Sequence, residues 1–363
     1  MKHWHETREV LDFLARVLGE GRRAALATVV RVRGSAYRHE GAKLAVAEDG
    51  TTAGNVSGGC LEQDVREVAL QVIRTGRAEL RSYCSSADEI EAWDLGVGCE
   101  GQVDVLFEPV GETWPRERAL LDERAPFAVC TVLPGSGEQG AGSRLIVTPD
   151  DAEGDLGSPA LTAGTVACAR DLLGSDDSGI HELAGRMVFI DVFEPPPQLV
   201  ILGAGDDARP LARFAADVGF RVVMVDRRPG YLTRERFPAA ARLLESRGDG
   251  LAAVLPLDPA CYAVVMTHNF ADDLAYVRAL LKTPAAYIGM LGPRQRTERI
   301  LRTLAAETQI EEGRVYGPVG LDIGTDGAEQ VALSVIAEIL AVRSGRRARS
   351  LRERAAPIHA PAD

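Results

Sequence analysis

The segment 54–64, GNVSGGCLEQD, places a cysteine just before a helix predicted over 61–72. Consecutive backbone N–H groups at a helix start form an anion-binding concavity, and the helix dipole favours negative charge there. The candidate residues are Ser57, Gly58, Gly59 and Cys60. The same dipole favours a thiolate at Cys60, which could ligate a soft metal or receive sulfur. A tight turn with a small buried cysteine explains the segment equally well.

Cys99 is the second cysteine in a setting that suits chemistry. It lies between glycines in GVGCEG, residues 96–101, just before a strand predicted over 103–107. A buried structural cysteine would have apolar neighbours, whereas these residues indicate an accessible thiol. A glycine-rich lead-in to the strand is the equal alternative. None of the six cysteines forms a CxxC pair, so neither a zinc ribbon nor a disulfide scaffold is expected.

A G-x-G-x-x-A pattern follows an apolar strand predicted over 199–202 and consists of Gly203, Gly205 and Ala208. In a dinucleotide-binding fold the first glycine permits a tight turn and the second lets the backbone approach a pyrophosphate. The third position is small so that the helix can pack on the strand. Asp226 ends the next predicted strand, where an acid can accept hydrogen bonds from ribose hydroxyls.

Two acids at the first turn of the following helix argue against tight NAD(P) binding. Asp206 and Asp207 lie where a pyrophosphate would come, and their charge would oppose it although it suits the helix dipole. We therefore expect the fold to be retained without tight NAD(P) binding. His268 follows a strand predicted over 262–266 and could donate to a ligand or serve as an acid or base. Capping or structural hydrogen bonding is the more common role of a lone histidine followed by acids.

The elements that position these residues alternate between strand and helix, which predicts an α/β protein. At 363 residues the chain is long enough for two domains, and the prolines before residue 198 indicate a stiff spacer between them. Asp326 and Glu329 have the spacing of a capping box for a last helix. The predicted order is an N-terminal α/β domain over 1–193 with an irregular middle segment 111–187, a Pro-rich linker 194–197, a Rossmann-like doubly wound parallel sheet over 198–342, and a basic tail 343–363.

Composition excludes several classes of function. The formal net charge of −12 disfavours non-specific nucleic-acid binding, because phosphate neutralisation needs clustered Lys and Arg. No apolar run reaches the roughly 18 residues of a membrane span. The first residues show no signal-peptide pattern, so a cytoplasmic protein with reduced thiols is expected.

Taken together, the motifs resemble the XdhC/CoxI family, the accessory proteins of molybdenum hydroxylases such as xanthine dehydrogenase. The resemblance covers most of the chain, although segment 111–187 carries little of it. The segments that carry it include GSAYRHEGAKL, GNVSGGCLEQDV, GVGCEGQVDVLFEP, FEPPPQLVILGAGDDARPLA, VVMTHNFADD, YIGMLGPRQR and GPVGLDIGTDGAEQVALSVIAEILA. Cys60 and Cys99 match the family's cysteine-bearing motifs.

The resemblance implies an XdhC-type N-terminal domain, a C-terminal Rossmann domain and a chaperone without turnover. Such a chaperone binds the molybdenum cofactor, a pterin with a phosphate that is sometimes extended by a nucleotide. It would protect the cofactor, assist its sulfuration with a cysteine desulfurase and insert it into an apo-hydroxylase. Cys60 would be the contact to molybdenum. Homodimerisation is expected from the general prevalence of two-fold dimers.

This sequence departs from the family pattern at Asp206, where the family often has histidine, and at Pro293, which removes one amide donor from a turn. Two alternatives to the cofactor chaperone remain. One is an NAD(P)-dependent oxidoreductase that uses the Rossmann domain, motivated by Gly203, Gly205 and Asp226. The other is an interaction scaffold that docks the hydroxylase and the desulfurase without holding the cofactor.

Overall fold

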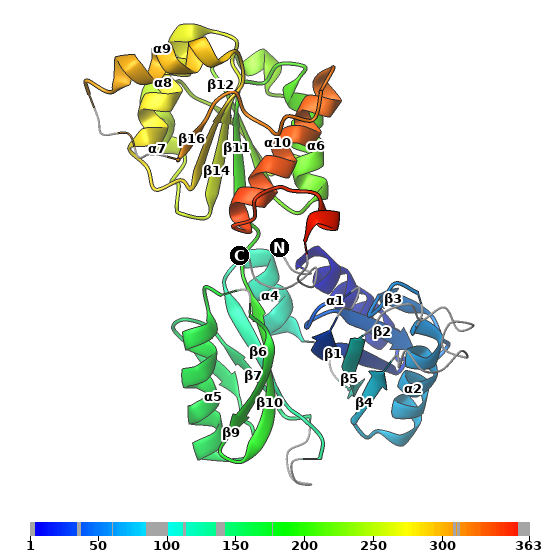
Figure 1. Ribbon diagram of the computed structural model, residues 1–363. Coiled ribbons are helices and arrows are strands. Elements are labelled where there is room, and N and C mark those ends of the chain that lie inside the picture. Colours follow the sequence, from blue (N-terminus) through cyan, green and yellow to red (C-terminus); the bar gives the residue numbers. More distant parts are fainter. Residues whose placement is uncertain are drawn as a thin grey trace. The chain divides into compact units, whose positions relative to one another are not determined.

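The structure is a computed structural model that describes residues 4–34, 38–59, 61–84, 101–111, 114–135, 142–175, 177–307, 310 and 313–354. Cys60 and Cys99 lie outside the described residues. The chain divides into two compact units, the first ending at Pro195 and the second beginning at Pro196 (Figure 1). In the described parts of the chain, no helix has both the length and the apolar character needed to cross a bilayer.

The first unit opens with a five-stranded antiparallel sheet in the order β3-β2-β1-β5-β4. Ala25, Ala27 and Val29 of β1 pack with helix α2, whereas Leu26 packs with helix α1. Successive side chains of a strand point to opposite faces, so helices on both faces explain the continuous apolar run of β1. The elements are α1 (Trp4–Gly19), β1 (Ala24–Gly34), β2 (Lys43–Ala47), β3 (Thr52–Gly54), α2 (Glu62–Thr75), β4 (Glu79–Cys84) and β5 (Gly101–Val110).

A second five-stranded antiparallel sheet, in the order β8-β7-β6-β10-β9, occupies most of the segment that the sequence indicates to be irregular. Helix α5 is not predicted from the sequence, because several of its residues are Thr, Gly or Val, which are weak helix formers. Ser158 caps it by accepting from the Leu161 amide, and Pro159 opens its first turn. The elements are α4 (Pro115–Glu123), β6 (Phe127–Val132), β7 (Arg144–Val147), β8 (Ala152–Gly154), α5 (Pro159–Leu172), β9 (Gly179–Leu183) and β10 (Arg186–Phe193).

A buried ion pair joins the two sheets of the first unit. Lys43 of β2 donates to Asp191 of β10, and the two side chains are 8% and 7% exposed. The Lys43 ammonium also donates to the Gly41 carbonyl at 3.0 Å and lies 5.0 Å from the centre of the Phe193 ring. Ser178 Oγ donates to the other Asp191 oxygen at 3.1 Å. Gly41 is required here, since a Cβ on it would lie 2.7 Å from Asp191 Oδ1.

The second unit is a six-stranded parallel sheet in the order β13-β12-β11-β14-β15-β16. This is the strand order of a doubly wound Rossmann fold, with its switch point between β11 and β14, and it confirms the predicted fold class. Helices α7, α8 and α9 cover one face, while α6 packs against α10 (Figure 1). The elements are β11 (Gln198–Leu202), α6 (Ala208–Asp217), β12 (Arg221–Asp226), β13 (Arg242–Glu245), α7 (Leu251–Val254), β14 (Cys261–Val265), α8 (Phe270–Leu281), β15 (Tyr287–Met290), α9 (Arg294–Leu304), β16 (Val315–Tyr316) and α10 (Ala328–Arg343).

The predicted capping box at α10 is wrong. The helix begins at Ala328 after Gly327, whose φ of 86° lies in the region that favours glycine. The Asp326 amide donates to the Gln330 side chain at 2.7 Å. The Gln330 side chain therefore accepts the hydrogen bond of a backbone amide just before the helix. Neither Asp326 nor Glu329 supplies a side-chain cap.

Replacing Lys43 with Met should destabilise the first unit by about 3–5 kcal/mol, because Asp191 would keep a buried charge without its partner. The double variant Lys43→Met/Asp191→Leu should recover most of this loss. All three tryptophans precede residue 195, so tryptophan fluorescence during urea unfolding reports on this unit. Arg23→Ala, which breaks the exposed Arg23–Glu48 pair, is the control. A similar loss in both single variants would contradict the assignment.

Candidate functional site

The turn between β11 and α6 needs its first glycine because another strand comes close. Gly203 has a φ of 119°, and a Cβ there would lie 2.5 Å from the Met266 carbonyl oxygen at the end of β14. Its amide donates to the Val225 carbonyl at 2.8 Å. A Cβ on Gly205 would lie 2.6 Å from Asp207 Oδ1. Gly203 therefore allows the turn to pack tightly against the end of β14, and Gly205 leaves room for the Asp207 side chain.

Asp226, at the end of β12, uses its carboxylate within its own chain. Oδ2 accepts from the Ala204 amide at 2.7 Å and from Arg228 Nη2 at 2.8 Å. Oδ1 accepts from the Arg228 amide at 2.9 Å and from Arg228 Nε at 3.0 Å. Burial by itself raises the pKa of Asp226, but these hydrogen bonds outweigh it and the pKa is lowered. A carboxylate has about four lone-pair sites, so this one is saturated.

Asp206, one of the two acids that the sequence places against a pyrophosphate, is paired with arginines. Arg236 Nη2 donates to Asp206 Oδ1 at 3.0 Å and to the Ala204 carbonyl at 3.1 Å. Arg209 lies 3.8 Å from the same Asp206 oxygen. The guanidinium groups of Arg228 and Arg236 lie 3.9 and 5.2 Å from the centre of the Tyr231 ring. The outer side of this turn is therefore a neutralised cluster rather than an acidic one.

Asp207 pairs with His268 at the opposite side of the turn. His268 Nε2 lies 2.6 Å from Asp207 Oδ2. The backbone of His268 has a φ of 58°, an uncommon conformation for a residue with a side chain, and Asn269 caps helix α8 directly after it. The structure thus brings together four predicted site residues, Gly203, Gly205, Asp226 and His268, at the carboxyl edge of the parallel sheet, where open α/β sheets bind ligands.

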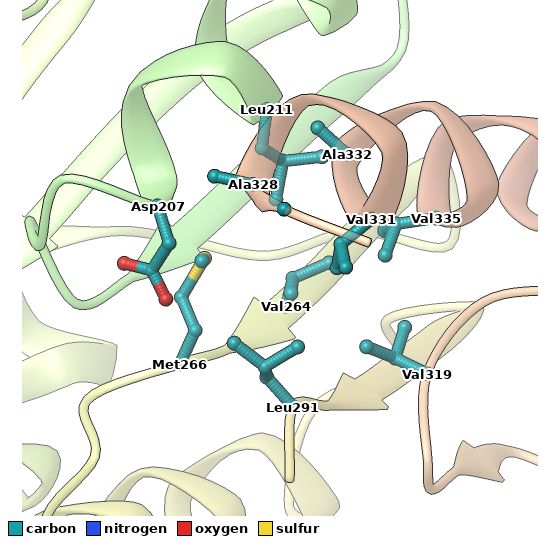
Figure 2. Close-up of a pocket in the computed structure, with 11 residues that line it drawn as sticks. Asp207, Leu211, Val264, Met266, Leu291, Val319, Ala328, Val331, Ala332 and Val335 are labelled. Carbon is teal, nitrogen blue, oxygen red and sulfur yellow. The ribbon is translucent and has the colours of Figure 1, made fainter. Parts of the chain in front are cut away.

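A pocket of about 280 Å³, here named the aliphatic pocket, lies at this edge (Figure 2). Side chains from α6 and α10 face side chains from the ends of β14 and β15. Asp207 is the one ionisable residue among those that line it. From the sequence, Asp207 is expected only to repel a pyrophosphate. The small residues at the start of α10 are the sequence feature that could have indicated the pocket. The lining residues are Asp207, Leu211, Val264, Met266, Leu291, Val319, Gly327, Ala328, Val331, Ala332 and Val335.

The glycine-rich turn of the first unit is organised by Ser57 and Glu62. Glu62 accepts from the Ser57 amide at 2.9 Å and from its hydroxyl. The Ser57 hydroxyl oxygen accepts from the amides of Gly59 and Leu61 at 3.2 and 3.1 Å. Two of the four amides expected to bind an anion, those of Ser57 and Gly59, therefore donate within the turn. Helix α2 begins at Glu62, two residues after Cys60.

Three of the thiols that the structure describes, two in strands and one in helix α5, are poorly suited to ligand chemistry. Burial raises the pKa of Cys130 to about 12 and that of Cys261 to about 11. Burial also raises the pKa of Cys168. A thiolate is the nucleophilic and metal-binding form, and the raised pKa values disfavour that form at neutral pH. Among the described residues, no group of three or more His, Cys, Asp and Glu side chains could hold a metal ion.

Replacing Arg228 with Ala should lower the free energy of unfolding of the second unit by about 1–3 kcal/mol at pH 7, because two charged hydrogen bonds to Asp226 are lost. Because the pKa of Asp226 is lower in the folded protein, the ionised carboxylate stabilises the fold. This contribution is fully present above the pKa of an unfolded aspartate, near 4, and is lost as the pH falls through the pKa of the folded protein. The variant should therefore lose less stability between pH 7 and 3 than the parent.

Circular dichroism during urea unfolding at each pH measures this difference. Arg227→Ala is the matched control, since Arg227 pairs with the partly exposed Asp272 at 2.7 Å. An equal loss in the two variants, or an unchanged pH dependence in Arg228→Ala, would contradict the role given to Asp226.

Family comparisons cover both units. The sequence model described as the XdhC Rossmann domain matches residues 199–339. The model described as the XdhC and CoxI family matches residues 17–84 and 120–183. The second range lies within segment 111–187, so this segment carries more of the family likeness than its sequence indicates.

Three known proteins are similar along nearly the whole chain. A protein of Bacillus subtilis (strain 168), named as a probable xanthine dehydrogenase subunit, is 31% identical over 329 residues, which cover 90% of this chain and 95% of that protein. The molybdenum cofactor insertion chaperone PaoD of Escherichia coli (strain K12) is 25% identical over 356 residues, 94% of this chain and 93% of that protein. A crystal structure described as a xanthine dehydrogenase from Bacillus halodurans superposes with a TM-score of 0.75 at 29% identity, covering 94% of this chain and 98% of that one. The chain therefore belongs to the XdhC and CoxI family.

Proposed function

We propose that this protein binds the molybdenum cofactor and inserts it into a molybdenum hydroxylase of the xanthine dehydrogenase type. The observation that carries the proposal is the similarity to PaoD, a molybdenum cofactor insertion chaperone, over 94% of this chain. This likeness extends through both units, so it is more than the sharing of a Rossmann fold. The similarity to a probable component of xanthine dehydrogenase supports the same class of partner.

Cys60 and Cys99 are the proposed thiol ligands. The buried thiols of Cys130 and Cys261 have raised pKa values, which leaves the glycine-flanked cysteines as better candidates for thiolate chemistry. Gly54, where the Cys60 segment begins, packs on the Lys43 backbone, and a Cβ there would lie 2.3 Å from the Lys43 carbonyl oxygen. The segment thus starts at the last residue of β3, which packs closely on β2. In the proposal Cys60 would hold the cofactor at its molybdenum while the cofactor is sulfurated with a cysteine desulfurase as partner.

The Rossmann unit serves the cofactor rather than a nicotinamide reaction. Asp226 would have to release hydrogen bonds to Arg228 or Ala204 before it could accept from a ribose, and each release costs the free energy of a charged hydrogen bond. The strand order and the two glycines favour some flat or phosphorylated ligand at the carboxyl edge of the sheet. The proposal also includes a cytoplasmic homodimer and allows a nucleotide-extended cofactor.

Cys60→Ala should weaken retention of the molybdenum cofactor by the full-length protein about tenfold or more, because a metal–thiolate contact is lost. Cys99→Ala should weaken retention or sulfuration as well. Pterin released on denaturation and molybdenum content, both per mole of chain, provide the readout. Cys84→Ala is the control, since Cys84 is exposed at the end of β4. Unchanged retention and sulfuration in both test variants would remove the thiolate part of the proposal.

NADH and NADPH should show no saturable binding up to about millimolar concentration, as expected when the ribose acceptor is already saturated. Nucleotide fluorescence during titration of the full-length protein measures this. Arg228→Ala should not gain strong binding, because two backbone amides still donate to Asp226. Micromolar binding of either nucleotide to the parent would favour the oxidoreductase alternative.

A further inference from the structure

Helix α10 carries apolar side chains on two sides, and only one of these sides is buried. We propose that the other side, together with the charged segments before and after the helix, forms a two-fold interface with a second copy of this chain, in which the two α10 helices lie antiparallel. This inference rests on the homodimer included in the proposed function and assigns the surface through which the copies pair.

The outward side of α10 has the spacing of a short helix-pairing seam. Ala332 and Val335 are buried on the inward side of the helix. Leu333, Ala337 and Leu340 follow one another at intervals of four and three residues, so they share a different side, and none of these three is buried. Alternating intervals of three and four residues bring two helices together in a coiled coil. Ala337, in the middle of the seam, is small and lets a second helix approach closely.

The most exposed apolar side chains lie on the same helix and beside it. Among the residues that the structure describes, the three most exposed large apolar side chains are those of Ile323, Leu333 and Leu351, at 55%, 56% and 60%. Ile323 precedes α10, and Leu351 follows it. A single exposed apolar residue is normal on a protein surface, whereas several on one helix and its flanks are typical of an interaction surface.

The charges at the two ends of α10 favour a second copy as the partner. Residues 322–329 hold three acids and no base, whereas residues 343–354 hold six arginines and one acid. Asp326 and Arg347 are exposed examples, and neither forms an ion pair within the part of the chain that the structure describes. A two-fold axis near Ala337 places the acidic end of one helix against the basic end of the other, so one symmetric contact satisfies both ends. A parallel pair would bring acid against acid.

The length of α10 shows that its flanks belong to the interface. The helix has 16 residues, which makes it about 24 Å long and about 10 Å wide. A stable dimer buries about 800 Å² on each partner, more than one side of such a helix supplies. The segments before and after α10 therefore take part, which accounts for the exposure of Ile323 and Leu351. Burial of apolar side chains supplies the affinity, and the charges set the antiparallel direction.

Sedimentation velocity of the full-length protein tests the proposal. At micromolar concentration we expect the parent to sediment as a species of twice the 38.9 kDa chain mass. Ala337→Glu should weaken the dimer about a hundredfold or more, because it brings two like charges together at the two-fold axis. Leu333→Gln, at an exposed position, should weaken it about tenfold. Val254→Gln is the matched control, since Val254 is an exposed apolar residue of α7. Circular dichroism checks that each variant folds.

Exchanging the charges tests the antiparallel direction. Asp322→Arg/Asp326→Arg should weaken the dimer, because arginines would then meet at both ends. Arg347→Asp/Arg349→Asp should weaken it as well, because acids would then meet there. The chain with all four substitutions should dimerise again, since its two ends are once more complementary. The parent dimer should also weaken as the salt concentration rises. Dimers of full strength in both double variants overturn the antiparallel arrangement.

An unchanged dimer in Ala337→Glu and Leu333→Gln shows pairing through another surface and overturns the inference. A parent that stays monomeric overturns it too, and loss of binding to a molybdenum hydroxylase in the same variants would then assign this side of α10 to that partner.

Retention of the molybdenum cofactor separates this inference from the proposed function. If the parent retains the cofactor as a monomer, the inference fails while cofactor binding stands. If the parent dimerises through α10 but never retains the cofactor, the surface assignment stands and the proposed function fails.

Discussion

Hydrogen bonds to the Asp226 carboxylate connect two loops at the carboxyl edge of the parallel sheet. Its hydrogen bond from the Ala204 amide fixes the glycine turn after β11, and its bonds from Arg228 fix the chain that leaves β12. That chain returns Arg236 to the Ala204 carbonyl, so the turn is held from two sides. The start of α6 is thereby set, and with it the position of Asp207 beside the aliphatic pocket. The acid that a dehydrogenase would offer to a ribose here accepts hydrogen bonds from its own chain, and this difference supports the proposal that the Rossmann unit does not serve a nicotinamide reaction.

The first unit depends on a comparable buried charge. Lys43 and Asp191 connect its two sheets, and the close packing at Gly41 leaves no room for a side chain beside that pair. The Lys43 backbone also forms the surface on which Gly54 packs, at the start of the cysteine-bearing turn. The turn is then shaped by its own serine and glutamate, which use amides that a bound anion would otherwise need. Two of the amides that an anion-binding nest would use, those of Ser57 and Gly59, are therefore already occupied within the turn.

Much of this architecture is predictable from sequence because periodic apolar patterns report burial directly. The parallel strands from 199 onward are buried on both faces and appear as continuous apolar runs, which is why the Rossmann unit is evident. The second sheet is less evident, since α5 depends on its Ser158 cap and its packing rather than on strong helix formers. Within the site, type and spacing locate Gly203, Gly205 and His268 at one edge. They do not reveal that Asp226 is saturated or that Asp207 lines a pocket, because hydrogen-bond partners far apart in sequence decide both.

Native mass spectrometry tests the central claim most directly, which is that this family member carries a molybdenum pterin and not a nicotinamide dinucleotide. The protein would be purified from cells that make the cofactor and measured with its non-covalent ligands intact. We expect an added mass equal to the molybdenum cofactor or its nucleotide-extended form, and loss of that mass in Cys60→Ala. A chain that carries NAD(H) or NADP(H), or that never carries a molybdenum pterin under these conditions, would contradict the claim.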